Sequence, residues 1–217
     1  MDTTVAFFIL ISVVNVITCL LLLVFIRKMV NFETTAIFYY AQAAIINYVA
    51  VTLVWKFLHN IAFSYYFGDY DLMAVLGILA VMYSFMTKSK KVEKCRVIDS
   101  VFLVLIACGI CWAYIAVLFS DITIYFSSIR LFFVLVICFL PILYILLFAF
   151  KRVEGLLVFG ICNIVIAIYF VYHMYGLIDY YHFYFMFFMY ISNFIFSLFF
   201  AYISLKGYFS WRNKLAG

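Results

Sequence analysis

The side chains that could do chemistry in this sequence are amides and hydroxyls placed in the middle of long apolar runs. Four amides, each near the centre of a different run, are Asn15, Asn47, Asn163 and Asn193. An uncharged amide at such a depth can hydrogen-bond a neighbouring helix or a neutral or zwitterionic solute. Tyr190, Asn193 and Ser197 follow an i, i+3, i+7 spacing, which places them on one helical face. We predict that these six residues form a substrate-binding lining.

Charged side chains avoid the centres of the apolar runs. Asp71, Arg130 and Glu154 stand at run ends, and Lys56 can extend its ammonium to an interface. A proton pump with buried carboxylates and an arginine-rich voltage sensor therefore lose support. Pro141 is the single proline of the chain. Because proline lacks an N–H, it frees a carbonyl inside a helix, and we predict a hinge there.

The sequence patterns that could indicate a metal site or an enzyme are weaker than the pattern of buried amides. His59, His173 and His182 lie near run ends together with aspartates, and His with carboxylates can bind zinc. They are weak candidates, because the H-x-x-x-H of heptahelical lipid hydrolases is missing, and we expect loop roles and no metal. Cys108 and Cys111 form a C-x-x-C in mid-run, where we expect helix packing. No nucleophile elbow, P-loop or dinucleotide-binding glycine pattern occurs, so we expect no cofactor and find little support for an enzyme.

The amino-acid composition indicates the class of protein that contains these residues. Of the 217 residues, 71% are apolar and 11% are charged, far from the roughly half-apolar, quarter-charged balance of soluble domains. The surface must therefore be solvated by lipid. The 14 basic residues stand in short clusters between apolar runs, which argues against a basic face for nucleic acid.

Seven apolar runs are long enough, or nearly so, to cross a bilayer of about 30 Å at 1.5 Å per residue. They cover residues 5–26, 36–57, 72–86, 101–119, 131–150, 156–175 and 183–205. The sequence therefore predicts an all-α, multi-pass integral membrane protein whose residues 1–217 form one heptahelical domain. With the N-terminus outside, twelve of the 14 basic residues fall on the inner side, which predicts N-out and C-in. Asp2 replaces the positive charge of a signal peptide, so we expect the first run to be retained.

A 3+1+3 pseudo-repeat is a further expectation. The first and fifth runs both end in a basic pair, Arg27-Lys28 and Lys151-Arg152, and the following run has a central asparagine in each case. The segment 141–156 is similar to the PQ-loop pattern of sugar and amino-acid exporters. However, Ile142 stands where that pattern has glutamine, and the first half has no proline, so we assign no family.

Three classes of function stay open at this point. A small-solute transporter with a neutral polar site near the bilayer midplane explains the central amides and the proline hinge. A receptor or sensor module, or a non-catalytic subunit of a larger membrane complex, explains the many Phe and Tyr residues equally well. A membrane enzyme is the third. The transporter is the most specific of these hypotheses. Its partners would be the lipid bilayer, a small neutral or zwitterionic solute, and a membrane-protein partner or second copy.

Overall fold

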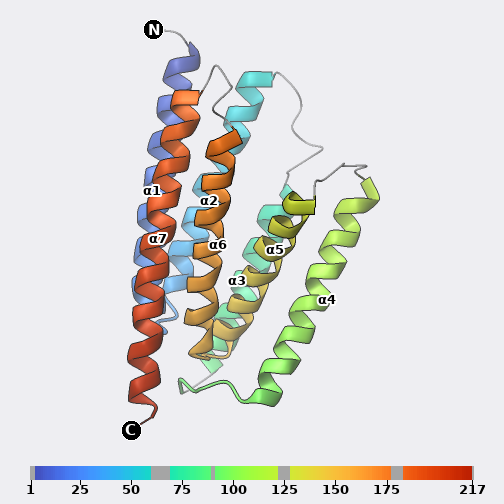
Figure 1. Cartoon of the computed structure of the whole chain (residues 1–217), viewed down its shortest axis with the longest axis vertical. Coiled ribbons are helices and arrows are strands. Elements are labelled where there is room, and N and C mark those ends of the chain that lie inside the picture. The colour runs from blue at the N-terminus through green and yellow to red at the C-terminus, as the bar shows by residue number, and fades with distance from the viewer. Residues whose placement is uncertain (1–2, 60–68, 89–90, 122–127, 177–182, 217) are drawn as a thin grey trace.

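The computed structural model describes residues 3–59, 69–88, 91–121, 128–176 and 183–216 (Figure 1). In this part of the chain it contains seven α-helices and one isolated β-bridge. The helices are α1 (Thr3–Met29), α2 (Ala36–His59), α3 (Asp69–Lys88), α4 (Val97–Asp121), α5 (Ser128–Ala149), α6 (Glu154–Gly176) and α7 (Phe183–Lys214). The prediction of an all-α chain is confirmed.

Helices satisfy every backbone polar group within the segment, which is why apolar runs of this length adopt them in lipid. Among the described residues, three helices have stretches long and apolar enough to cross a membrane: Ser12–Met29, Glu154–Tyr172 and Tyr190–Lys214. The other four helices carry shorter apolar stretches: Ala36–Ile46, Ile78–Lys88, Val97–Ile110 and Phe139–Ala149. These features indicate association with a membrane.

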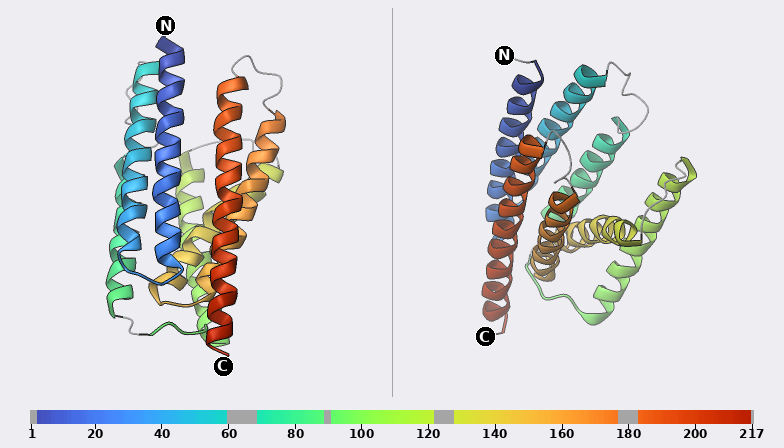
Figure 2. Two further views of the ribbon diagram at one scale, coloured as in Figure 1. Left: turned by 90° about the vertical axis from the view of Figure 1, so that its left-hand side faces the viewer. Right: turned by 45° about the horizontal axis from the view of Figure 1, so that its top comes forward.

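Six of the helices pack in a closed ring. Its order is α1, α2, α3, α5, α6, α7 and back to α1. The fourth helix stands outside this ring, packs mainly against α5, and lies at the edge of the bundle away from α1 and α7 (Figures 1 and 2). Three helices of the ring therefore precede α4 in the chain, and three follow it.

Among the side chains that the structure describes, the most tightly buried ones gather toward one end of the ring. The main core cluster includes Met29 at the end of α1, Ala36 at the start of α2, Phe148 near the end of α5 and Leu156 near the start of α6, all fully buried. We call this end the basic end, because it also carries Arg27, Lys28, Lys88, Lys151, Arg152 and Lys206. The C-terminus lies at this end and the N-terminus at the opposite end (Figure 1).

The turn between α1 and α2 closes the basic end with a defined backbone motif. Phe32 has a φ of 54°, in the left-handed region. Its N–H donates to the Met29 carbonyl (2.8 Å), and the Glu33 N–H donates to the Lys28 carbonyl (3.1 Å). This pair of hydrogen bonds is a Schellman motif. The Lys28 ammonium also donates to the Glu33 carboxylate (2.8 Å), and that hydrogen bond lowers the pKa of Glu33.

The turn between α5 and α6 repeats that motif. Lys151 has a φ of 50°, and its N–H donates to the Phe148 carbonyl (2.9 Å). The Arg152 N–H donates to the Leu147 carbonyl (2.8 Å). The left-handed residue of the second turn therefore follows that of the first, Phe32, by 119 positions along the chain.

A segment before α4 is held against the second turn. The Glu93 N–H donates to the Lys151 carbonyl (3.2 Å), and the Val153 N–H donates to the Glu93 carbonyl (3.2 Å). The Arg152 guanidinium reaches the carboxylates of Glu93 (2.7 Å) and Asp99 (3.2 Å). Charge-assisted hydrogen bonds of this kind are stronger than neutral ones. They fix the start of α4 to the turn between α5 and α6.

Candidate functional site

The structure brings some of the predicted polar residues together where α1 meets α7. The Asn15 amide donates to Ser192 Oγ (3.1 Å), and the Cys19 thiol donates to Asn193 Oδ1 (3.7 Å). Asn15 and Cys19 lie one turn apart on α1, whereas Ser192 and Asn193 are neighbours on α7. We call these four residues the α1–α7 seam. Two of them, Ser192 and Cys19, were not predicted from the sequence.

The remaining predicted lining residues lie on α6 and α7. Asn163 is 6% exposed, and its amide N–H donates to the Phe159 carbonyl of its own helix (2.8 Å). Ser197 is equally buried on α7. The ring of Tyr190 is half-buried and lies against Phe170 of α6, with centroids 5.6 Å apart. One amide N–H of Asn163 is thus used in a hydrogen bond within α6.

Several predicted residues lie outside what the structure describes. Asn47 is on α2, but its side chain is outside the described residues, and so are the side chains of His59 and His173 and the whole of His182. Among the residues that are described, no three His, Cys, Asp or Glu side chains gather in a way that could hold a metal. Pro141 is half-buried within α5, which continues on both sides of it. Its role as a hinge stays a prediction.

A buried aromatic cluster was not predicted from the sequence. Phe25 of α1 and Tyr40 of α2 meet edge to face with ring centroids 5.1 Å apart. Tyr144 of α5 and Phe159 of α6 do the same at 4.9 Å. We call these four rings the aromatic quartet. Phe25 also contacts Phe159 (6.0 Å), and the side chains of Tyr40 and Tyr144 meet through their hydroxyl ends. This polar contact joins α2 to α5.

The four residues of the aromatic quartet have a regular spacing along the chain. Phe25 and Tyr40 are 15 positions apart, and so are Tyr144 and Phe159. The offset between the two pairs is 119, which is the same offset that relates the two Schellman turns. An offset of 119 superposes these aromatic positions, whereas the offset of 124 between the basic pairs does not.

No protein-family model matches this chain, no curated protein is similar, and no solved structure is similar. Its function must therefore be argued from its own geometry.

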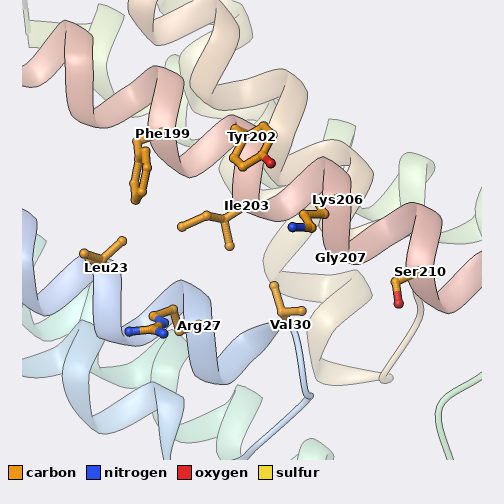
Figure 3. Close-up of a pocket in the computed structure, with 9 residues that line it drawn as sticks. All are labelled: Leu23, Arg27, Val30, Phe199, Tyr202, Ile203, Lys206, Gly207 and Ser210. Atoms are coloured by element: carbon orange, nitrogen blue, oxygen red, sulfur yellow. The ribbon is translucent and has the colours of Figure 1, made fainter.

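A groove of about 570 Å³ lies between α1 and α7 at the basic end (Figure 3). Leu23, Arg27 and Val30 line it from α1, at a spacing of i, i+4, i+7. On α7, Tyr202 and Lys206 stand one turn apart on the opposite wall. In the sequence Arg27 and Lys206 serve as topology signals, and the structure places them on facing walls of one groove.

Proposed function

We propose that this chain spans the membrane seven times, with its N-terminus outside and its C-terminus inside, as two three-helix halves joined by α4. Three apolar helices of spanning length support the membrane placement. The ring order supports the halves, because α1–α2–α3 and α5–α6–α7 follow one another around it. The concentration of basic residues at the end that holds the C-terminus supports the orientation.

A pseudo-twofold relation between the halves is supported by the aromatic quartet. Such an axis exchanges Phe25 with Tyr144 and Tyr40 with Phe159. The contact of Phe25 with Phe159 then corresponds to the contact of Tyr144 with Tyr40, and both occur. In this register Lys28 corresponds to Leu147. The two basic pairs used to align the halves in the sequence are therefore not equivalent positions.

The proposed function is transport of a small neutral or zwitterionic solute between these halves. The observation that carries it is the nature of the boundary between them. Asn15 with Ser192 and Cys19 with Asn193 are hydrogen-bonded pairs that cross it, and Tyr40 meets Tyr144 across it. Uncharged polar pairs between membrane helices contribute little stability each and cost little to exchange for a solute or for water, so a boundary built from them can open. Pro141 of α5 would serve as the hinge of such an opening.

A membrane-complex subunit is the second candidate, and α4 favours it. Between Val97 and Trp112, the described side chains of this helix include large exposed apolar ones, such as Ile98 (82% exposed) and Trp112 (76%). Lipid or a second membrane protein would cover them. A subunit would form a detergent-resistant assembly and carry no solute.

The transport proposal is tested by flux. Purified protein in lipid vesicles should equilibrate at least one compound from a panel of labelled sugars and zwitterionic amino acids faster than protein-free vesicles do. Absence of flux for the whole panel, together with a stable assembly in detergent, would favour the subunit.

The topology is tested by labelling Cys95. This residue lies in the segment before α4, and its N–H donates to Glu154 (2.8 Å). In a variant whose other cysteines are replaced, an impermeant thiol reagent should label Cys95 only after cells are permeabilised, because the basic end faces inward. In a separate cysteine-free background, Thr3→Cys should show the opposite behaviour. Labelling of Cys95 in intact cells would contradict N-out and C-in.

The contact between Tyr40 and Tyr144 gives a test of movement between the halves. Cys162 of α6 is 2% exposed beside this pair. We expect Tyr144→Phe to raise the rate at which N-ethylmaleimide modifies Cys162 about fivefold, because loss of the polar contact with Tyr40, worth about 1 kcal/mol, favours the open state. Tyr83→Phe removes a hydroxyl from a side chain that is 40% exposed and is the control. Equal protection of Cys162 in both variants would speak against an opening boundary.

A further inference from the structure

The groove between α1 and α7 has fixed walls. Gly207 lets the helices approach so closely that a Cβ atom there would lie 2.8 Å from Val30 Cγ1. One turn further, the Trp211 indole donates to the Val30 carbonyl (2.6 Å), and its ring contacts Phe32 (5.8 Å). These contacts join the end of α1 to α7. The groove above them is therefore a preformed feature of the fold.

The mouth of the groove is positively charged. Arg27 of α1 and Lys206 of α7 both line it, from facing helices (Figure 3). The residues that line it include no carboxylate, and within the described part of the chain neither cation forms an ion pair. Lys206 lies over the ring of Tyr202 (5.9 Å), which orients its ammonium. Ser210, one turn beyond Lys206 on α7, adds a hydroxyl to the lining.

Away from the mouth, the groove continues as an apolar track. Phe199 and Leu23 line its deeper part, and Phe199 lies about 10 Å further along α7 than Lys206. On α1, a stripe of exposed apolar side chains leads up to Arg27. It consists of Val13, Ile17, Leu20 and Val24. On α7 the neighbouring exposed side chains are Ile195 and Leu198. A cationic mouth thus leads into a surface suited to hydrocarbon.

We propose that this groove binds an anionic phospholipid of the inner leaflet. Its phosphate would lie between Arg27 and Lys206, Ser210 would donate to a phosphate or headgroup oxygen, and one acyl chain would follow the track past Phe199. A free phosphate would leave the apolar track unused, and a zwitterionic lipid would bring its own ammonium group to a mouth that already holds two cations. Basic pockets between helices on the cytoplasmic side suit anionic headgroups. The choice of leaflet rests on the proposed topology, whereas the choice of ligand rests on the groove.

The test is lipid binding to the purified full chain in a neutral detergent, measured by native mass spectrometry. Dioleoyl phosphatidylglycerol should bind at least tenfold more tightly than dioleoyl phosphatidylcholine. Since each basic residue near an anionic headgroup is worth about fivefold, Arg27→Gln with Lys206→Gln should weaken phosphatidylglycerol binding about thirtyfold. Ser210→Glu, which leaves both cations in place, should also weaken it. Phosphatidylcholine binding should not change.

The matched control removes one lysine and one arginine elsewhere at the basic end. Lys88→Gln with Arg96→Gln changes the net charge by the same amount, and both side chains are exposed. This variant should bind phosphatidylglycerol as the unmodified chain does. Equal weakening in both double variants, or full displacement of the lipid by equimolar glycerol phosphate, would overturn the proposal. Detergent removes any dependence on orientation, so failure here is distinct from failure of the Cys95 labelling test.

Discussion

Phe148→Ala should lower the free energy of unfolding by about 3 kcal/mol, at the low end of the range for Phe→Ala in protein cores. Phe148 is fully buried, and its ring contacts Phe32 of the first turn, Tyr144 of its own helix and Phe159 of α6. Lipid tails are as apolar as the core, so little is lost by exposing apolar surface to them. What is lost is the packing of a ring that joins both halves at the basic end, and a cavity remains.

Phe150→Ala is the matched control for that substitution. It removes the same side chain two positions along the chain, where the residue is 39% exposed and contacts Phe85. We expect a loss of about 1 kcal/mol or less there, as for surface substitutions. Unfolding in mixed micelles with a rising fraction of denaturing detergent measures both variants. Equal losses would mean that the basic end is not the packed core of the fold.

Helix positions could be predicted from hydropathy, but the ends of the helices could not. The last apolar run ends at residue 205, whereas α7 continues to Lys214. The added turns carry Trp211, whose indole hydrogen-bonds the Val30 carbonyl at the end of α1. Hydropathy measures how much of a helix lies in hydrocarbon. The end of a helix depends on contacts that form only when the bundle is assembled.

The turns at the basic end show a second limit. Glycine at the left-handed position is the usual sequence signal for a Schellman motif, but Phe32 and Lys151 occupy those positions here. Phe32 is buried against Phe148 and Trp211, which explains why a large side chain is kept at a strained φ. The sequence therefore offers basic pairs as landmarks, and these pairs give an offset of 124 positions, whereas the two left-handed residues are 119 positions apart.

The polar residues could be found one by one, but their pairing could not. Asn15 and Asn193 are visible in the sequence as amides within apolar runs. Their partners, Ser192 and Cys19, are small residues of types common in any membrane helix. Which of them faces an amide depends on the rotation of each helix about its axis, and that rotation is set by packing across the whole ring.

Asn193→Leu should reduce solute flux at least tenfold while the free energy of unfolding changes by about 1 kcal/mol or less. The small stability change is expected because interhelical hydrogen bonds in membrane proteins contribute about 0.6 kcal/mol on average. The large flux change is expected if the amide contacts the solute when the boundary between α1 and α7 opens. Asn213→Leu, at an exposed position near the end of α7, should leave both quantities unchanged. Flux into vesicles and unfolding in mixed micelles are measured on the same preparations.

Cys19→Ala separates a solute contact from a structural one. It removes the thiol that donates to Asn193 Oδ1 but leaves the amide in place. If Asn193 binds solute, flux should survive Cys19→Ala and be lost in Asn193→Leu, because the amide itself is what the solute requires. If Asn193 serves only to hold α7 against α1, the two substitutions remove the same hydrogen bond and should have the same effect on flux. Equal effects would therefore remove Asn193 from the solute site and leave it in the α1–α7 seam alone.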